Sequence, residues 1–245
     1  MIEMIQTAVP WLTTEQMVEV DRAMMEDYGI ALIQMMENAG RNLAHLARTR
    51  FLGGDACGAD VVVLAGPGGN GGGALVCARR LAAWGTRVSV IAARADTAFT
   101  PIPAHQLDVI RRMGVVVRRA ADLPDVSASA LIIDGLIGYS LSGDPRGDAA
   151  DLIRWANSAD ASVLSLDVPS GIDTTTGTIH TPAVVATATM TLALPKQGLR
   201  ARGVPAHVGE LYLADISVPP ELYASPALGL EVGAIFAKRD IVRLN

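Results

Sequence analysis

The sequence predicts an α/β fold in which a doubly wound, mainly parallel sheet lies between two layers of helices. Three observations lead to this prediction. Short β-branched runs alternate with stretches of helical periodicity along most of the chain. Half of the residues (50%) are hydrophobic but only 4% are aromatic, which favours a helix-covered parallel sheet over a β-sandwich. The first strand passes through a glycine-rich turn directly into a helix, which is the first half of a βαβ unit.

Two helices are expected ahead of the sheet, over about residues 13–52. Thr13 and Gln16 have the spacing of a capping box, so a first helix is predicted over 15–27. A second helix is predicted from residue 30 or 31 to about residue 51, because two glycines follow it.

The strands and helices of the core then alternate over about residues 60–220. Strands are predicted over 61–65, 86–92, 115–117, 131–134, 162–167, 190–194 and 210–214, with helices over 75–81, 104–113 and 148–157. No long helix separates the last two strands, so that edge of the sheet is expected to be irregular. A short terminal helix is expected to begin within 237–240. No repeat or linker divides the chain, so residues 1–245 are expected to form one domain.

Composition also limits the partners of this chain. The net charge of −5 and the pI of about 5.3 argue against a general surface for nucleic acids or anionic membranes. Two cysteines make neither a disulfide framework nor a zinc site. We see no signal peptide and no apolar run near the roughly 20 residues of a membrane span. A cytoplasmic protein without nucleic-acid or membrane partners is therefore expected.

The glycine-rich turn is the strongest single motif. Six of the eight residues from Gly66 to Gly73 are glycine, and the pattern G-x-G-x-x-G occurs within them. Backbone N–H groups at the start of the next helix favour an anion such as a phosphate. Asn70 is the turn's one side chain with a hydrogen-bonding group. The alternatives are a tight turn without a ligand and, less favoured, a P-loop, which would need a Lys-Ser/Thr pair after the last glycine.

Polar residues follow three of the predicted strands. Asn70 lies in the turn after the first strand, and Asp134 and Asp167 end two others. These strands are neighbours in the common doubly wound order, so their carboxyl ends would meet at one crevice. Two carboxylates there would repel each other unless they are protonated, paired or bridged by a cation. With a further oxygen from Ser170 and no His or Cys in these turns, a hard cation is favoured, and helix capping is the alternative.

The loop over 138–147 follows the strand that ends at Asp134. Its glycines and polar residues are typical of a loop that covers a ligand. Asp144 is a candidate acid or base, with Arg146 as its partner or as a phosphate contact. The alternative for this loop is a solvated turn that begins at an Asp-Pro pair.

Several motifs, taken in order, resemble the NAD(P)H-hydrate epimerase family, whose domain is of the YjeF N-terminal type. They are MMENAG, GPGGNGGGALVCARRL, LIIDGLIGYSLSGDPRG, LSLDVPSGIDTTTG, LALPKQGL and VGELYLADISVP. The resemblance covers about residues 13–219 and implies a Rossmann-like three-layer fold. It also implies interconversion of the R and S epimers of hydrated NADH or NADPH, NAD(P)HX, which carry a hydroxyl on C6 of the nicotinamide ring.

The resemblance implies a set of site residues. Asn70, Asp134 and Ser170 would bind a potassium ion, and Asp144 and Asp167 are the acid–base candidates. The substrate would contact Gly69, Asn70, Gly71, Gly72, Gly73, Gly138, Tyr139, Ser140, Leu141, Ser142, Gly143, Asp144 and Asp167. A separate ATP- or ADP-dependent dehydratase is the implied pathway partner, and a homodimer stays open.

The family's turn usually reads GPGNNGGDG, whereas this chain has Gly69 and Gly73 in place of the first Asn and the Asp, and Ala74 in place of the last Gly. These departures suggest one alternative function, a non-catalytic nucleotide- or protein-binding module of the same fold. A second alternative, an NADP-dependent oxidoreductase, is suggested by G-x-G-x-x-G together with Arg94 after the second strand.

Overall fold

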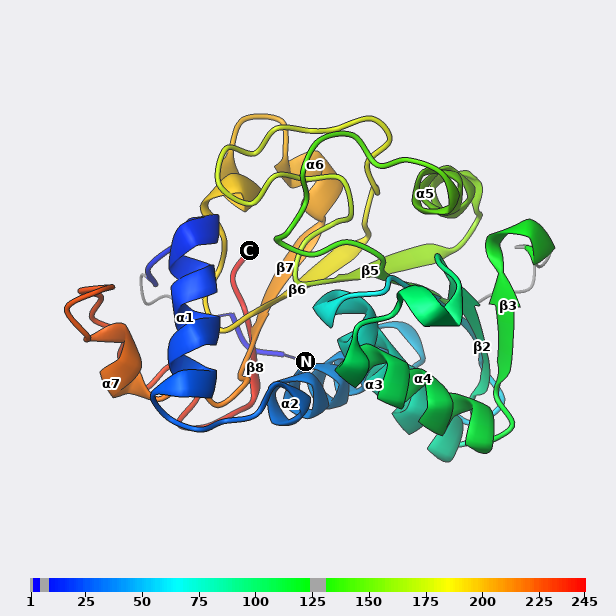
Figure 1. The fold of residues 1–245 in the computed structure, drawn as a ribbon, viewed down its shortest axis with the longest axis horizontal. Helices are drawn as coiled ribbons and strands as arrows, with labels where there is room; N and C mark the ends of the chain where they lie inside the picture. Colours follow the sequence, from blue (N-terminus) through cyan, green and yellow to red (C-terminus); the bar gives the residue numbers. More distant parts are fainter. Residues whose placement is uncertain (1, 5–8, 124–130) are drawn as a thin grey trace.

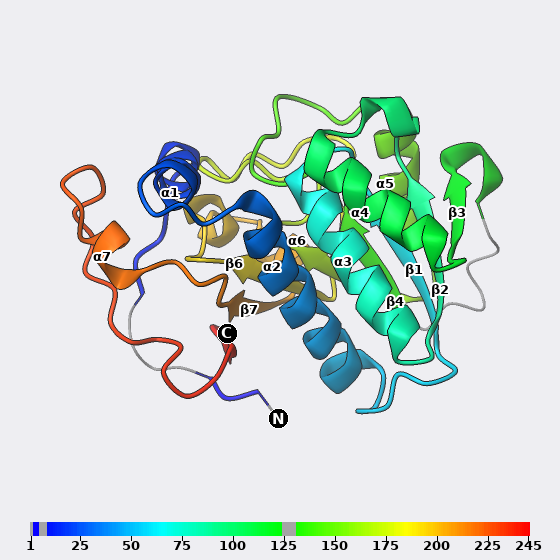
Figure 2. The same ribbon diagram turned by 60° about the horizontal axis from the view of Figure 1, so that its bottom comes forward.

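The computed structural model describes residues 2–4, 9–123 and 131–245. They form an eight-stranded sheet, in the order β3-β2-β1-β4-β5-β6-β7-β8, shown in Figures 1 and 2. The strands are β1 (Asp60–Ala65), β2 (Arg87–Ala92), β3 (Val116–Arg119), β4 (Leu131–Gly135), β5 (Ser162–Leu166), β6 (Ala188–Leu192), β7 (Glu210–Ala214) and β8 (Ile241–Arg243). The pairs from β3 to β7 are parallel and β8 is antiparallel to β7. The predicted mainly parallel, doubly wound sheet is confirmed.

Helices cover both faces of this sheet. They are α1 (Thr14–Glu26), α2 (Leu32–Leu46), α3 (Gly69–Ala83), α4 (Pro101–Arg112), α5 (Asp148–Ser158), α6 (Pro205–Val208) and α7 (Pro220–Tyr223). The helices α2, α3 and α4 lie side by side on one face, and α5 lies on the other (Figures 1 and 2). Within the described residues, no helix is both long and apolar enough to span a membrane.

Strand β1 shows how the sequence produces these three layers. Val61 and Val63 pack with the cluster that contains α2, α3 and α4, whereas Val62 and Leu64 pack with the cluster that contains α5. Neighbouring side chains of a strand point to opposite faces. A continuous apolar run is therefore needed where both faces are covered, and that run was the signal in the sequence.

Helix α1 begins where the capping box predicts. Thr13 Oγ1 accepts a hydrogen bond from the backbone N–H of Gln16 at 3.2 Å, and Gln16 Oε1 accepts one from the N–H of Thr13 at 2.9 Å. The buried side of α1, with Met17, Val20 and Met24, packs on residues that follow β6 and β7. Helix α1 therefore lies over the carboxyl ends of those strands.

The C-terminal segment corrects one prediction. No helix begins within 237–240; the chain turns there and then forms β8 beside β7. The open edge of β7 explains this, because the N–H of Leu244 donates to the carbonyl of Leu211 at 2.8 Å. The predicted absence of a long helix between β6 and β7 is confirmed, since only a 3₁₀ turn over 197–200 and the four residues of α6 separate them. The expected irregularity of the sheet is wrong for these strands, because β6 and β7 pair in continuous parallel register and β8 forms the edge.

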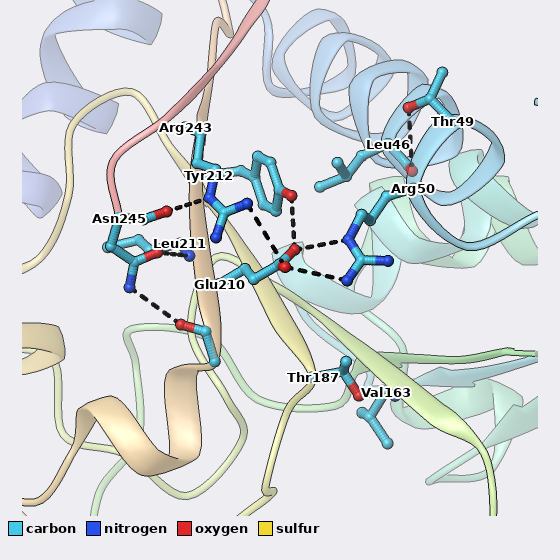
Figure 3. Close-up of polar contacts among 11 residues, drawn as sticks. Leu46, Thr49, Arg50, Val163, Thr187, Glu210, Leu211, Tyr212, Arg243 and Asn245 are labelled. Atoms are coloured by element: carbon cyan, nitrogen blue, oxygen red, sulfur yellow. Dashed lines mark hydrogen bonds and ion pairs between the residues drawn. The ribbon is translucent and has the colours of Figure 1, made fainter. Parts of the chain in front are cut away.

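A cluster of charges ties β7 to the end of the second helical segment (Figure 3). Glu210 accepts hydrogen bonds from Arg50 at 2.8 and 3.1 Å and from the hydroxyl of Tyr212 at 2.7 Å. Arg243 of β8 lies 3.6 Å from the same carboxylate. Arg50 belongs to a π-helical turn, Ala47–Phe51, that continues α2, so the predicted second helix is confirmed with a change of helix type in its last part.

Candidate functional site

A cavity of about 880 Å³ opens at the carboxyl ends of β1, β4 and β5. Its wall consists of the glycine turn, the loop after β4, the residues that follow β5 and one side of α1. This is the place where a doubly wound sheet binds ligands, because the strand order reverses between β1 and β4. Its size is that of a site for a small molecule or cofactor.

The glycine turn allows a close approach of two backbone segments. A Cβ at position 66 would lie 1.9 Å from the carbonyl oxygen of Leu136, and a Cβ at position 71 would lie 1.8 Å from the carbonyl oxygen of Gly66. Only glycine fits there. Helix α3 already begins at Gly69, so Gly69 to Gly73 are its first residues and part of the predicted turn is helix. Gly68, Gly69 and Asn70 line the cavity, so the start of this helix, where N–H groups lack a partner within the helix, lies at its wall.

Asp134 and Ser170 form the buried polar centre of the site. Asp134, fully shielded from solvent, accepts hydrogen bonds from Ser170 Oγ at 2.6 Å and from the Ser170 N–H at 2.9 Å. Ser165 Oγ donates to it at 2.8 Å and the N–H of Leu136 at 3.2 Å. Burial raises the pKa of this carboxyl, while the hydrogen bonds from Ser170, Ser165 and Leu136 act in the opposite direction.

Asn70 approaches the same segment from helix α3. Its side-chain nitrogen donates to the carbonyl of Leu166 at 2.9 Å, and its oxygen would lie 3.3 Å from a Cβ at position 138. Ser170 Oγ accepts from the N–H of Ile137 at 2.9 Å and lies 3.3 Å from that residue's carbonyl oxygen. The amide oxygen of Asn70 and the hydroxyl of Ser170 thus lie beside residues 137–138, and Ser170 links them to the carboxylate of Asp134. An all-oxygen donor set of this kind fits a hard monovalent or divalent cation.

Asp167 is held differently from Asp134. Its backbone has a φ of 65°, a left-handed conformation that is uncommon outside glycine. Its Oδ1 accepts hydrogen bonds from the N–H of Leu192 at 3.1 Å and from Thr191 Oγ1 at 3.3 Å, and it forms an ion pair with Lys196 Nζ. Lys196 is fully buried and also donates to the carbonyl of Leu192 at 2.9 Å.

These contacts correct the charge argument drawn from the sequence. The two carboxylates of the crevice do not depend on a shared cation, because Asp167 is paired with Lys196 and Asp134 is surrounded by donors. Sequence reasoning assigned no role to Lys196, which lies 29 residues after Asp167. The signal that could have found it was a single lysine directly after an apolar run, in LALPKQGL.

Asp144 lies at the rim of the cavity, with a side chain that is 59% exposed. Its Oδ1 accepts a hydrogen bond from the N–H of Thr181 at 3.1 Å and lies 3.1 Å from Nδ1 of His180. These two contacts hold the pKa of Asp144 below its usual value. Arg146 was a predicted partner, but the hydrogen bonds come from His180 and Thr181; Arg146 lines the cavity and acts only through its charge.

Helix α1 contributes a residue that the sequence did not reveal. Asp21 lines the cavity and accepts a hydrogen bond from the hydroxyl of Tyr139, a residue of the loop after β4. Burial raises the pKa of Asp21, and burial together with Asp21 raises that of Tyr139. The sequence showed α1 only as an amphipathic helix, so which acidic residue would face the site could not be read from it.

Comparison with known proteins decides the family. Residues 32–198 match the family described as YjeF-related protein N-terminus. The chain belongs to this family. A protein of Dehalogenimonas lykanthroporepellens named NAD(P)H-hydrate epimerase is 41% identical over 223 residues, which are 90% of this chain and 87% of that relative. One of the same name from Truepera radiovictrix is 37% identical and covers 83% of this chain and 87% of its own length.

Some relatives are longer than this chain. A protein of Salinibacter ruber named bifunctional NAD(P)H-hydrate repair enzyme Nnr is 37% identical over 86% of this chain, which matches 41% of that protein.

A solved structure has the same fold. The crystal structure of yeast ynu0 superposes with a TM-score of 0.80 over 96% of this chain and 100% of the yeast chain, at 24% identity. The family resemblance and the predicted fold are confirmed.

Two of the three departures from the usual turn, Gly69 and Gly73, lie in different surroundings. At Gly69 a Cβ would have one neighbour, Met36 Cε at 4.0 Å, so a side chain has room there. At Gly73 a Cβ would lie 2.8 Å from Leu166 Cδ2. Leu166 is buried and fills the space that a larger residue at position 73 would need.

Proposed function

We propose that this chain is an NAD(P)H-hydrate epimerase that interconverts the R and S forms of NAD(P)HX in the repair of nicotinamide cofactors. The observation that carries the proposal is the single cavity into which the glycine-rich start of α3, Asp144 and Asp167 all open. The helix start suits the phosphates of a dinucleotide, and the carboxylates supply groups that transfer protons. The names of the relatives support the same reaction.

The reaction needs a proton donor for the C6 hydroxyl and access for water to the opposite face of the nicotinamide ring. Protonation lets the hydroxyl leave as water, and the lone pair of the neighbouring ring nitrogen stabilises the resulting cation. Water then adds to C6 from the opposite face and gives up a proton to a base. The ring is not oxidised or reduced, so the cycle begins and ends with the same number of protons and electrons.

We assign the proton transfer at C6 to Asp144 and the positioning of the ring cation mainly to Asp167. The contacts from Thr181 and His180 favour the ionised form of Asp144, which suits a base that accepts the proton of the added water. For the loss of the C6 hydroxyl, His180 would pass a proton to Asp144, and Asp144 would donate it to the leaving hydroxyl. The proton that Asp144 later accepts from the added water restores the starting state. Among the described residues all donors to Asp167 reach Oδ1, which leaves Oδ2 to face the positive ring.

We further propose that a potassium ion belongs to this site, held by Asn70, Asp134 and Ser170. Asn70 and Ser170 lie beside residues 137–138, Ser170 is hydrogen-bonded to Asp134, and residues 137–138 lead into the loop over 138–144 that would contact the substrate. When bound, the ion supplies positive charge close to the phosphates and to the loop. The chain's own residues position the loop, because Ser170 already joins Asp134 to Ile137 by hydrogen bonds.

The proposal extends to the protein's surroundings. The bifunctional relatives, of which this chain matches about two-fifths, support a separate dehydratase that removes water from the S epimer and so restores NAD(P)H. We propose a cytoplasmic location, where nicotinamide cofactors are used, and we leave a homodimer open.

The decisive experiment is epimerisation of the purified R-hydrate of NADPH, followed by chromatography that separates the two epimers. The proposal expects approach to the R/S equilibrium at a rate proportional to protein concentration and well above a protein-free control. Binding of the hydrate without any increase in rate would instead support the non-catalytic module suggested by Gly69 and Gly73. Oxidation of NADPH at 340 nm would support the oxidoreductase.

A further inference from the structure

Arg94 lies at the carboxyl end of β2, on the wall of the cavity. It follows β2 by two residues and lines the cavity beside Pro67 and Gly68 of the glycine turn. The segment that carries it is attached to that turn, because the N–H groups of Ala93 and Thr100 donate to the carbonyls of Ala65 and Pro67, each at 3.0 Å. The position of Arg94 relative to the turn is therefore set by the backbone.

The positive charge of Arg94 is available to a ligand. The acidic residue that follows it, Asp96, is paired with Arg111 at 2.9 Å. On the neighbouring strand, Arg119 is paired with Asp148 at 3.6 Å. Within the described part of the chain no carboxylate forms an ion pair with Arg94, whose side chain is exposed. An unpaired guanidinium at the rim of a nucleotide-sized cavity is suited to a phosphate.

The strand order indicates which phosphate of a bound dinucleotide would lie beside Arg94. The glycine turn lies at the end of β1, between β2 on one side and β4 with β5 on the other. Asp144 and Asp167 lie on the β4–β5 side, so the nicotinamide ring belongs there, and the pyrophosphate would rest on the start of α3. The adenosine ribose then falls on the β2 side, beside Arg94. Figure 2 shows β1 and β2 side by side behind α3 and α4.

We propose that Arg94 binds the 2′-phosphate of the adenosine ribose, so that this protein prefers hydrated NADPH to hydrated NADH. The inference rests on the proposed epimerase function and adds its substrate preference. In dinucleotide-binding folds an Asp or Glu near the end of the second strand holds the ribose 2′-hydroxyl of NAD, and an Arg accommodates the 2′-phosphate of NADP. Here Ala93 and Ala95 flank the arginine, and Asp96 is occupied.

The test compares kcat/KM for the R-hydrates of NADPH and NADH in the wild type and in Arg94→Ala. We expect the wild type to favour the NADPH hydrate, and Arg94→Ala to lower kcat/KM for it by about 10- to 100-fold, with a much smaller effect on the NADH hydrate. Arg94→Lys should recover part of the preference. Arg118→Ala, which removes an exposed arginine of β3 that does not line the cavity, should leave the ratio unchanged.

A binding measurement keeps this inference separable from the proposed reaction. Calorimetry with adenosine 2′,5′-bisphosphate should show tighter binding than with adenosine 5′-monophosphate, and Arg94→Ala should remove the difference. If neither hydrate is epimerised, the proposed function fails, and the bisphosphate titration still decides the role of Arg94. Equal binding of the two nucleotides, or a kcat/KM ratio that Arg94→Ala leaves unchanged, would overturn the inference.

Discussion

Lys196 forms an ion pair with Asp167 that is almost fully shielded from solvent: the lysine side chain is 0% and the aspartate side chain 5% exposed. The aspartate follows β5 and the lysine follows β6, so the pair joins the ends of two neighbouring parallel strands beneath the cavity. A buried charge without its partner is far more costly than the intact pair. The contact therefore couples the stability of the sheet to a residue of the proposed site.

Lys196→Met should lower the free energy of unfolding by about 3–5 kcal/mol, because it leaves the carboxylate of Asp167 buried and unpaired. The double variant Lys196→Met with Asp167→Asn should recover most of that loss. Chemical denaturation of the wild type, both single variants and the double variant measures the coupling. Additive effects of the two substitutions would show that the pair does not act as a unit.

Contacts that are local in sequence were predictable, and those that depend on topology were not. Thr13 and Gln16 are three residues apart, so their reciprocal hydrogen bonds follow from spacing alone. Asp134 and Ser170 could be brought together because both follow strands that a doubly wound sheet places side by side. Asp167 follows β5 and Lys196 follows β6, so the two residues meet only because these strands are neighbours in the sheet. The hydrophobic periodicity of the sequence does not show which strands are neighbours.

The same limit applies to the ends of the chain. Asp21 belongs to a helix whose amphipathic pattern fixes which side is buried but not what the helix covers. The segment over 237–240 has the composition of a helix start, yet the residues after it pair with the open edge of β7. A free strand edge offers hydrogen bonds to any extended segment that can reach it. This pairing outweighs the local helix propensity of the segment.

The unusual glycines of the turn should respond differently to restoration of the family residues. Gly69→Asn should leave the melting temperature nearly unchanged, because position 69 has open space around its Cβ. Gly73→Asp should cost about 1–3 kcal/mol, since the buried Leu166, whose Cδ2 lies 2.8 Å from the new Cβ, must move. Combining Gly73→Asp with Leu166→Val should restore part of the stability. Thermal unfolding checks all three, and a Gly73→Asp variant as stable as the wild type would contradict this account.

The Glu210 cluster predicts a pH-dependent contribution to stability. The hydrogen bonds from Arg50 are the main cause that lowers the pKa of Glu210 from 4.5 to about 2. A carboxyl whose pKa is lower in the folded state contributes stability above its unfolded pKa and loses it as the pH falls from about 4.5 towards 2. Arg50 is 43% exposed, so solvent screening limits this contribution to about 1 kcal/mol.

Glu210→Gln should therefore lower the melting temperature at pH 7 by about 2–4 °C, and this difference should shrink as the pH falls below about 4.5. Asp151→Asn removes one carboxylate of an exposed pair with Arg154 and should change the melting temperature much less. A Glu210→Gln effect that stays constant between pH 7 and pH 3 would contradict the assignment of the lowered pKa.

The proposed potassium site predicts an ion-specific change in stability. Potassium chloride should raise the melting temperature of the wild type above that in choline chloride of equal ionic strength, because a ligand that binds the native state stabilises it. Asp134→Asn removes the carboxylate charge and should abolish the shift. Ser165→Ala removes one hydrogen bond to that carboxylate but keeps its charge, so the shift should persist. The same potassium shift in Asp134→Asn would rule out this ion site.

Substitutions of the two candidate acid–base residues, Asp144 and Asp167, should affect kcat and Kd differently. Asp144→Asn keeps the shape of the side chain and removes its ability to take up a proton, so kcat should fall about 10²–10⁴-fold while the Kd for the hydrate stays within a few-fold. The side chain is exposed at the rim, so the fold should be unaffected. Asp108→Asn, an exposed carboxylate of α4 paired with Arg112 at 2.7 Å, serves as the matched control and should keep wild-type kinetics.

Asp167→Asn should behave differently, because its carboxylate is buried against Lys196. We expect weaker binding of the hydrate at least as large as the loss in kcat, together with lower stability from the uncompensated lysine. Measuring kcat, Kd and the melting temperature for both variants resolves the two roles. Near-normal turnover in Asp144→Asn would remove it from the chemistry. A binding loss confined to Asp144→Asn, with slow turnover in Asp167→Asn, would show that Asp167 transfers the proton and Asp144 positions the ring.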